Sequence, residues 1–552
     1  MRNAIISTGI AMIWMSAGAL AQTQSSALWV PEINGVYYAV QFPGSDAGAS
    51  INACLLAAQT SGVGVCDASG FKGILPVAEN MFAGMTTPFE LILSPNASYQ
   101  LSAEQIVVAP DSSIVTHHGN ELSNASFNAD ISGTMFDLKD AQGFKMQDIG
   151  IYGGNTGTTG IELNGGIADT WNIYFDRISV AYFTGTAIDN SSPSLFSVTM
   201  TNNGTTVTGT LASGTFPTNW IGQTAGQEIG ISGASNSTFN YNYLTGGNSR
   251  YVSPVVIINS STTFTISAGP SSGWSPAIAS GVTATIGFYS GAQVWVCHTC
   301  QNEHNGTGYA TIWATGIFED GSFAEESGHG ISAINGSDTV LSGVTFSSNG
   351  SDIYLAGNGA SIQSTNDWFE LSTNGIVTAA SGVTGYNFQS ANDILHSNTN
   401  LINVSSAGAG SIALTNDIIN SVAPSPVFEG ATGTTWSGTN AFSGSTQPSF
   451  TSGVFPNGRF NSVYVGTSTN PNLSENSNYL LLEGETYGGQ IVNQANSAVI
   501  WSWDNSGNIF AGNGTNIVYR CTAPAAYVGF LTTTKGTGDT CTAGTDTGLR
   551  TK

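Results

Sequence analysis

Residues 319–336, EDGSFAEESGHGISAING, concentrate proton-exchanging side chains in a chain otherwise poor in charge. Four carboxylates and His329 lie within this segment, and a second acidic group around Trp368 follows downstream. Glycoside hydrolysis requires two carboxyl groups, about 5 Å apart for retention and about 6.5–9.5 Å apart for inversion. The carboxylates and the histidine are therefore candidate catalytic residues, and Trp368 is a candidate surface for stacking a sugar ring. The predicted catalytic residues are Glu319, Asp320, Glu326, His329, Asp367 and Glu370.

The elements that position these residues repeat along the chain. Apolar positions recur at intervals of 22 to 27 residues, with turn sequences such as SSNGSD and STNG between short apolar runs. This period predicts coils of a parallel β-helix, each of which buries its apolar face only when stacked on its neighbours. Leucine-rich repeats have a similar period, but their fixed Leu and Asn pattern is absent. The repeat positions are Ile331, Ile353, Ile376 and Leu401, and upstream Phe136, Ile161 and Ile188.

Stacked coils predict how far apart the carboxylates lie. Equivalent positions of neighbouring coils are separated by about 4.8 Å, the spacing of paired strands. Glu326 and Glu370 are two coils apart by sequence, about 9–10 Å, and Glu370 and Asp393 are one coil apart. Stacked carboxylates repel, which raises the pKa of one and makes it a candidate proton donor. The alternative is that these acids lie in solvated loops at the coil corners.

Composition bounds the fold and the partners. Gly accounts for 69 of 552 residues, and Gly with short polar residues disfavours helix interiors, so we predict an all-β protein. The net charge of −24 argues against nucleic acid, whose binding requires neutralised phosphates. Arg177 and Arg250 are the only cations between residues 146 and 454, which also argues against a polyuronate substrate. Arg177 is the predicted substrate-binding cation.

The N-terminus is typical of an exported protein. Arg2 precedes an apolar run, and Ala19-Leu20-Ala21 fits a small-residue cleavage site, so residues 1–21 are predicted to be a signal peptide. No later segment is apolar for long enough to predict a membrane span. We therefore expect a protein that is secreted or located at the cell surface.

Residues 44–71, GSDAGASINACLLAAQTSGVGVCDASGF, read as a short amphipathic helix, a Gly-rich turn and a strand. This pattern resembles the N-terminal segment of the pectate-lyase-like superfamily, which includes rhamnogalacturonase-like and epimerase-like proteins. The resemblance implies a right-handed parallel β-helix whose N-terminal helix caps the open end and shields unpaired strand edges. Cys54 and Cys66 would staple this cap to the first coil.

The six cysteines form three local couples, which predict disulfides in an exported protein. Cys297-His298-Thr299-Cys300, with His304 nearby, also resembles a metal or redox site. A tetrahedral zinc site requires four ligands, however, and the chain has no second CxxC, so we predict no metal there. The two remaining interpretations of Cys297 and Cys300 are a local disulfide and two free thiols. The predicted disulfide cysteines are Cys54, Cys66, Cys297, Cys300, Cys521 and Cys541.

Two stretches interrupt the coil repeat. The first stretch predicts a β-sandwich-like insertion that could bind a glycan or act as a spacer. The second predicts a linker followed by a small C-terminal β-module. The C-terminal module resembles attachment or trimerisation modules of tail-fibre-like proteins, which implies a homotrimer. The predicted segments are 1–21 (signal peptide), 22–194 (cap and N-terminal coils), 195–287 (inserted module), 288–425 (C-terminal coils), 426–457 (linker) and 458–552 (C-terminal module).

Gly328-His329-Gly330 resembles the Gly-His-Gly of polygalacturonase-type glycosidases, which share the β-helix. Their Asn-Thr-Asp, Asp-Asp and Arg-x-Lys motifs are absent, so only His329 carries over. We predict hydrolysis of a polysaccharide or cell-surface glycan by paired carboxylates, without a cofactor. The alternatives are a non-catalytic glycan-binding or adhesion protein with a β-helix stalk, and a polysaccharide lyase. For a lyase, the resemblance implies Ca²⁺.

Overall fold

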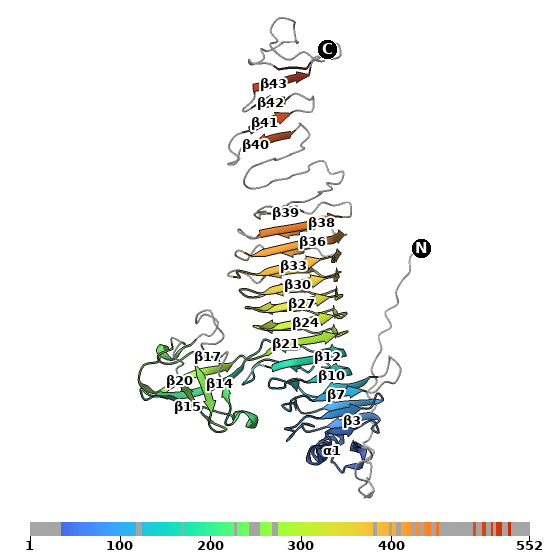
Figure 1. Ribbon diagram of the computed structural model, residues 1–552, viewed down its shortest axis with the longest axis vertical. Helices are drawn as coiled ribbons and strands as arrows, with labels where there is room; N and C mark the ends of the chain where they lie inside the picture. The colour runs from blue at the N-terminus through green and yellow to red at the C-terminus, as the bar shows by residue number, and fades with distance from the viewer. Residues whose placement is uncertain are drawn as a thin grey trace.

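The computed structural model describes most of the chain after residue 34 (Figure 1). The predicted signal peptide, Cys521 and Cys541 lie outside the described residues. The described ranges are 35–116, 124–167, 170–225, 229–241, 254–267, 274–378, 383–396, 400–404 and 410–420, followed by strands β37 to β44 between Val427 and Phe530.

The fold is a parallel β-helix, as predicted, whose coils stack into a long column (Figure 1). Each coil supplies strands to a first and a second parallel ladder, which merge through the long strands β10, β12 and β36 into one 21-stranded sheet. The first ladder contains β1 (Tyr37–Tyr38), β2 (Val65–Asp67), β4 (Glu90–Leu93), β7 (Ser113–Thr116), β10 (Lys145–Tyr152), β12 (Thr170–Ala181), β21 (Ala292–His298), β24 (Thr315–Glu319), β27 (Asp338–Ser342), β30 (Ser361–Thr365), β33 (Asn387–Ala391), β36 (Ser411–Asn420) and β38 (Thr435–Phe442).

The second ladder is narrower, and a separate third sheet of 11 strands closes the coil. The second ladder adds β3 (Gly73–Val77), β5 (Ala97–Leu101), β8 (Ala125–Ala129), β22 (Gln301–Glu303), β25 (Ser322–Ala324), β28 (Thr345–Ser347), β31 (Trp368–Glu370) and β34 (Ile394–His396). The third sheet contains β6 (Gln105–Ile106), β9 (Thr134–Asp137), β11 (Thr159–Glu162), β13 (Thr186–Asn190), β23 (Thr307–Ile312), β26 (His329–Ile334), β29 (Ser351–Leu355), β32 (Asn374–Thr378), β35 (Asn400–Asn403), β37 (Val427–Glu429) and β39 (Ser449–Thr451).

The register confirms most of the predicted repeat. Ile331, Ile353 and Ile376 pair in sequence across the third sheet. The fourth position is Ile402 rather than Leu401, because β35 is shifted by one residue from the predicted alignment. Paired apolar residues face inward and form a continuous core, in which the rings of Phe346 and Phe369 are stacked 4.8 Å apart. The upstream positions Phe136, Ile161 and Ile188 also pair as predicted.

Single residues in the left-handed conformation turn the chain at two corners of the coil, with φ between 50° and 70°. The first corner joins the first ladder to the second, and the second corner follows the second ladder. Left-handed backbone favours Gly, Asn and Asp, which accounts for many of the first-corner residues. The first-corner residues are Asp148, Arg177, Thr299, Asp320, Gly343, Asn366, Asn392 and Asn416, and the second-corner residues are Tyr182, His304, Glu325, Ser348 and Leu371.

Helix α1 (Ala47–Ser61) caps the N-terminal end of the column, as predicted (Figure 1). The side chain of Asp46 accepts a hydrogen bond from the backbone N–H of Ala49, and Gly62 ends the helix with φ 75°. Both features are standard helix caps. The predicted disulfide between Cys54 and Cys66 joins the helix to β2.

Replacing both Cys54 and Cys66 with alanine should destabilise this cap by about 3 kcal/mol, because the disulfide closes a loop of about a dozen residues. Hydrogen exchange of the α1 amides, compared with amides of β24 in the same sample, would measure the effect. Faster exchange in α1 alone is expected. Equal acceleration in both places would show instead that the disulfide stabilises the column as a whole.

An antiparallel sheet of seven strands interrupts the coils between β13 and β21 and projects from the side of the column (Figure 1). It has its own apolar core around Trp220 and Phe288. The Asp140 carboxylate of the column accepts hydrogen bonds from the Trp220 Nε1–H and the Asn219 Nδ2–H, which fasten the module's base. The strands are β14 (Ser194–Asn202), β15 (Val207–Leu211), β16 (Thr224–Ala225), β17 (Ile229–Ser232), β18 (Val255–Ile258), β19 (Thr263–Ser267) and β20 (Ala279–Phe288).

The described strands nearest the C-terminus form a five-stranded antiparallel sheet. They belong to the segment in which the sequence predicts a small β-module. Their bounds are β40 (Gly489–Val492), β41 (Val499–Trp503), β42 (Ile509–Ala511), β43 (Thr515–Arg520) and β44 (Val528–Phe530). Within the described residues, no helix has the length and apolar character needed to cross a membrane.

Candidate functional site

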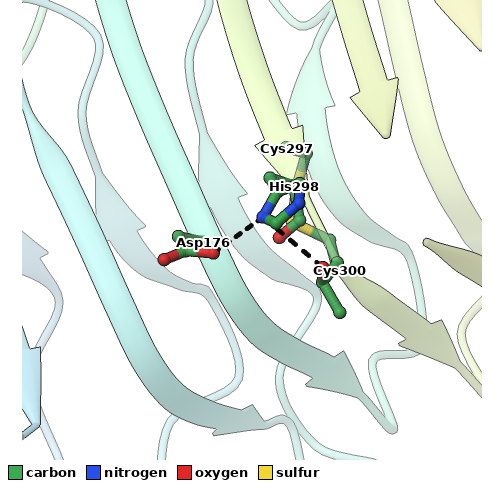
Figure 2. The surroundings of a disulfide bond; sticks show 5 residues. Asp176, Cys297, His298 and Cys300 are labelled. Carbon is green, nitrogen blue, oxygen red and sulfur yellow. Dashed lines mark hydrogen bonds and ion pairs between the residues drawn. A yellow bond between two sulfur atoms is a disulfide. The ribbon is translucent and has the colours of Figure 1, made fainter. Parts of the chain in front are cut away.

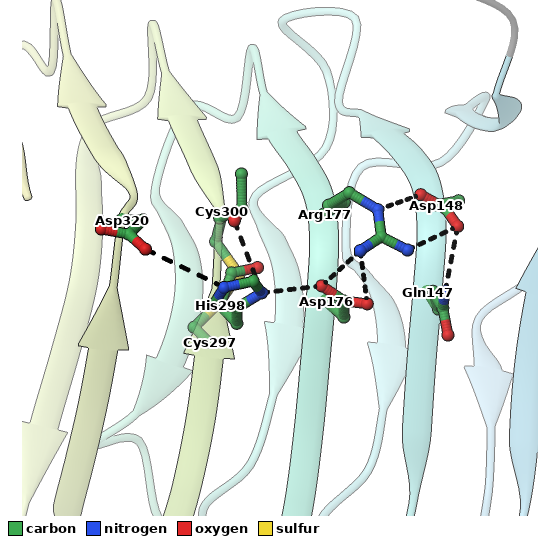
Figure 3. Close-up of polar contacts among 9 residues, drawn as sticks. Gln147, Asp148, Asp176, Arg177, Cys297, His298, Cys300 and Asp320 are labelled. Carbon is green, nitrogen blue, oxygen red and sulfur yellow. Dashed lines mark hydrogen bonds and ion pairs between the residues drawn. A yellow bond between two sulfur atoms is a disulfide. The ribbon is translucent and has the colours of Figure 1, made fainter. Parts of the chain in front are cut away.

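A row of charged side chains crosses four neighbouring coils at the first corner (Figure 3). We call Asp148, Arg177, Asp176, His298 and Asp320 the charged row. The Arg177 guanidinium donates to both carboxylate oxygens of Asp148, at 2.6 and 3.0 Å, and also contacts Asp176 at 2.8 Å. These contacts raise the pKa of Arg177, mainly through the hydrogen bonds to Asp148. The guanidinium is thus shared between two carboxylates of the protein itself.

His298 lies between two carboxylates of the charged row. Its Nδ1 is 2.9 Å from Asp176 Oδ1, and its Nε2 is 4.0 Å from Asp320 Oδ2. The imidazole remains 34% exposed, whereas Asp176 is buried. A buried carboxylate on one ring nitrogen fixes the imidazole's orientation and leaves the other nitrogen available for proton transfer.

The disulfide Cys297–Cys300 holds the corner that carries His298 (Figure 2). It confirms the local pairing that the sequence predicts for the CHTC segment. Both cysteines are buried, and the disulfide bridges the end of β21 to the residue before β22 across the left-handed Thr299. Among the described first corners, this one alone carries a covalent crosslink. The side chain of His298 is therefore anchored by Asp176 and its backbone by the disulfide.

Exposed aromatic rings lie on β12, the strand that carries Asp176. Trp171 is 45% exposed, and Tyr174 is also exposed, two residues before Asp176. Lys145 Nζ lies 5.7 Å from the centre of the Tyr174 ring. Burial, followed by the charges of Asp176 and Glu319, raises the pKa of the Tyr174 hydroxyl. Aromatic faces next to ionisable groups suit a sugar, whose ring has apolar faces and a polar rim.

Two of the predicted catalytic residues lie at this site. Glu319 is in register with His298 on the neighbouring strand, and its side chain is exposed. Asp320 is a member of the charged row, with its side chain 73% exposed. Gly343 occupies the next first corner, where a Cβ atom would lie 2.5 Å from Asp320 Oδ1, so this glycine gives the carboxylate room. Arg177 also belongs to the row, but its ion pairs hold Asp176 and Asp148.

Glu326 lies inside the column and not in a solvated corner. It is 1% exposed, and its two oxygens accept hydrogen bonds from the backbone N–H and the Nδ2–H of Asn305, at 2.7 and 3.1 Å. Burial raises the pKa of this carboxyl to about 8. Its own N–H donates to Asn349, so Asn305, Glu326 and Asn349 form an internal polar ladder. Its burial inside the column keeps this carboxyl out of reach of a polysaccharide outside.

Asp367 belongs to a second internal ladder. Asp367, Asp393 and Asp417 are buried, and each accepts a hydrogen bond from a backbone N–H on the preceding coil. The hydroxyl of Ser364 lies 2.6 Å from both Asp367 Oδ2 and Asp393 Oδ2. Burial raises the pKa of Asp367 to about 7 and also raises that of Asp393. Stacked acids with raised pKa values therefore occur, but they are turned into the column.

The predicted stacking of Glu326 on Glu370, and of Glu370 on Asp393, is wrong. Glu370 pairs with Ser347 and His396 on the second ladder. Glu326 precedes β26 and belongs to the Asn305 ladder instead. The intervals of 44 and 23 residues match two coils and one coil, but the residues lie at different positions within their coils. A separation of one coil length therefore does not show that two residues are stacked.

The remaining predicted residues lie away from the charged row. His329 begins β26 on the third sheet, where its Nδ1 is 2.6 Å from Ser351 Oγ and its ring is stacked on Tyr354 at 4.1 Å. Burial lowers the pKa of His329. Trp368 is exposed on β31, and its Nε1–H donates to Glu370 at 3.0 Å. These residues do not converge with Glu319 and Asp320.

Sequence reasoning missed Asp176 and His298, which form the centre of the site. They lie 122 residues apart in sequence, because the inserted module separates β12 from β21. Removing residues 195–287 from the sequence and aligning NIYFDRISVA with VWVCHTCQNE would have placed the two side by side. The Cys-His-Thr-Cys segment was recognised as unusual, but only as a metal or disulfide motif.

A second group of carboxylates lies on the third sheet and was also missed. Asp137 and Glu162 pair on β9 and β11, and Lys139 Nζ lies 3.3 Å from each. Burial, assisted by the charge of Asp137, raises the pKa of neighbouring Glu104 to about 7. These carboxylates come from successive coils, so no short sequence motif contains them together. In the part of the chain that the structure describes, no cluster of three or more His, Cys, Asp or Glu is arranged to hold a metal ion.

Comparisons with known proteins find only solved structures of low similarity. Neither the protein families nor the curated proteins compared with this sequence contain a match. Solved structures similar to the chain include the A-module of a mannuronan C-5 epimerase from Azotobacter vinelandii, with 11% identity and TM-score 0.34 over 74% of this chain and 87% of that one. Tailspike protein 3 of bacteriophage CBA120 has 9% identity and TM-score 0.39 over 87% and 70%. The catalytic unit of a GH87 α-1,3-glucanase from Streptomyces thermodiastaticus has 9% identity and TM-score 0.33 over 77% and 69%.

Proposed function

We propose that this protein binds a neutral or weakly charged polysaccharide across the charged row and hydrolyses it there. The observation that carries the proposal is the placement of His298. It is anchored on buried Asp176, its side chain is 34% exposed, and it is in register with exposed Glu319. Exposed Trp171 and Tyr174 beside the row supply apolar faces for sugar rings. Carboxylates outnumber cations in the row, which opposes binding of a polyanion.

Hydrolysis requires two proton transfers at this site. The bond between the anomeric carbon and the glycosidic oxygen breaks, the oxygen of water bonds to the anomeric carbon, and the leaving oxygen gains a proton. His298 and Glu319 occupy paired positions on neighbouring strands, about 4.8 Å apart at the backbone. One group can donate a proton to the leaving oxygen while the other accepts one from water. Asp176 and Arg177 orient His298 from the opposite side.

The test is a reducing-end assay of the purified full chain on a panel of neutral and acidic polysaccharides. Ultraviolet absorbance is recorded in parallel, because a lyase forms unsaturated sugars that absorb and a hydrolase does not. New reducing ends without absorbance, lost in His298→Ala, are the expected result. Products that absorb ultraviolet light would show that the protein cleaves its substrate by elimination and not by hydrolysis.

Binding without cleavage is the second candidate function. The burial of Glu326 and Asp367 favours it, because these two predicted acids are committed to the internal ladders. Retention of a polysaccharide by the immobilised protein, with no new reducing ends, would identify a glycan-binding protein. In that case Trp171 and Tyr174 would matter for retention and His298 would not.

A further inference from the structure

The second corner carries a row of exposed side chains that neither the sequence analysis nor the charged row accounts for. The rings of Tyr182 and His304 are stacked 4.9 Å apart and nearly parallel, at 13°. His304 Nδ1 lies 3.0 Å from Glu325 Oε2 on the following coil. Tyr182 is 41% exposed, and the Glu325 side chain is 60% exposed. A tyrosine, a histidine and a carboxylate thus follow one another across three coils.

Backbone conformation makes these residue types unusual for their positions. Tyr182, His304 and Glu325 have φ values of 63°, 57° and 55°. Left-handed backbone favours Gly and Asn and is unfavourable for bulky side chains by about 1 kcal/mol or more. A tyrosine at such a position therefore needs a reason beyond turning the chain. The result here is an aromatic ring that projects outward from the corner.

One side of the Tyr182 ring has no neighbour in the row. His304 lies against the ring from the following coil. On the preceding coil, Gly153 occupies the position opposite Tyr182, since Tyr152 pairs with Ala181. A Cβ atom at Gly153 would lie 2.6 Å from the Tyr182 carbonyl oxygen, so close backbone packing keeps a side chain out of this position. The row therefore begins with an aromatic side chain that is 41% exposed.

We propose that Tyr182, backed by His304, is a stacking platform for a pyranose ring, and that Glu325 accepts hydrogen bonds from sugar hydroxyls at its edge. The ligand class is a neutral oligosaccharide, because an anionic sugar would face the Glu325 carboxylate. An aromatic face with a carboxylate beside it matches the apolar face and polar rim of a pyranose.

The platform extends the proposed function and rests on it. His298 and His304 belong to the same coil, with β22 between them. The platform therefore lies across the narrow second ladder from the charged row. A glycan bound at both places would cross the column over Gln301 of β22, whose side chain is exposed. The platform would then bind sugar units beside the bond that is cleaved, without contacting the reacting atoms.

Calorimetric titration with cellohexaose, laminarihexaose and mannohexaose tests the platform. Tyr182→Ala should raise the Kd of the hexasaccharide that binds by about threefold to tenfold, the contribution of one aromatic contact. Tyr182→Phe keeps the ring and should bind like the wild type. Leu371→Ala is the matched control, because Leu371 is an exposed second-corner residue with φ 58° three coils beyond His304.

A second readout locates the ligand without relying on turnover. The imidazole signals of His304 and His329 in a histidine-labelled sample should respond differently to the hexasaccharide, with a shift for His304 only. An unchanged Kd in Tyr182→Ala, together with an unmoved His304 signal, would overturn the platform while leaving cleavage at His298 in place. Failure of the wild-type protein to bind any of the three hexasaccharides would overturn both the platform and the proposed function.

Discussion

Replacing His298 with alanine is expected to lower polysaccharide turnover by about 10²–10⁴-fold, the contribution of a positioned general acid or base. The affinity for the polysaccharide should change little, because Trp171 and Tyr174 still supply the stacking surface. Asp176→Asn should also lower turnover, because it removes the charge that holds His298 in one tautomer and one orientation.

His329→Ala is the matched control for this experiment. His329 is also a half-buried histidine bound through its Nδ1 to a neighbouring strand, but it lies on the third sheet. Its removal should leave kcat within about twofold of the wild type, and His298→Ala should not. Initial rates on the polysaccharide identified in the reducing-end assay would measure both effects. Equal losses in the two variants would point to general destabilisation and would remove His298 from the mechanism.

The Asp393→Asn variant is expected to unfold at a higher temperature than the wild type at pH 8, and at nearly the same temperature at pH 5. The reason is the number of protons in the Asp367 ladder. Ser364 bridges Asp367 and Asp393, and Ser390 contacts Asp393. These three contacts between oxygens require three protons, but the two hydroxyl groups supply two. A carboxyl group supplies the third.

The sign of the pH dependence follows from this requirement. Burial raises the pKa of Asp367 and of Asp417 from 3.8 to about 7. A carboxyl with a raised folded-state pKa binds more protons when folded than when unfolded. Its stabilisation is therefore present at acidic pH and is lost as the pH rises towards 7, at about 2 kcal/mol per group between pH 5 and pH 8. The wild-type column should be most stable in acid.

An asparagine at position 393 supplies the hydrogen-bond donors that the ionised ladder lacks. Its amide group can donate one hydrogen to Ser364 and one to Ser390, while its oxygen still accepts the N–H of Asp367. The Ser364 hydroxyl is then free to donate to ionised Asp367. Thermal unfolding of both proteins from pH 5 to pH 9 would measure the difference in their unfolding temperatures. The raised pKa values of Glu326 and Glu104 affect both proteins equally and so do not contribute to this difference. A variant as sensitive to pH as the wild type would show that the ladder does not hold extra protons.

The coil, its period and its cap could be predicted from the sequence because each is a local pattern. Inward-facing residues such as Ile331 and Ile353 recur at the coil length, and the 44–71 segment contains both the helix and its cysteine couple. The phase of polar residues within a coil could not be predicted in the same way. Asn366-Asp367, Asn392-Asp393 and Asn416-Asp417 repeat a corner residue followed by a ladder residue, a signal that went unread.

The candidate site was predicted only in part, for two physical reasons. Glu319 and Asp320 were found because adjacent acids are visible in one segment. Asp176 and His298 were missed because their contact forms only when β12 and β21 pair across the inserted module. Burial was also misjudged for Glu326, since acids are seldom placed inside a protein unless they are hydrogen-bonded there and burial raises their pKa.

Two successive coils of the first ladder have the same length, so a whole coil can be removed there without changing which side chains face inward. Thr315 pairs with Asp338, and Asp338 pairs with Ser361, at equal intervals of 23 residues. Deleting residues 338–360 would bring Ser361 against Thr315 in the same phase and move Trp368 one strand spacing, about 4.8 Å, closer to His298. Deleting one residue more or one residue fewer would shift the following strand by one position and turn its core side chains outward. Insertions and deletions can thus change the separation of surface residues along the axis only in discrete steps.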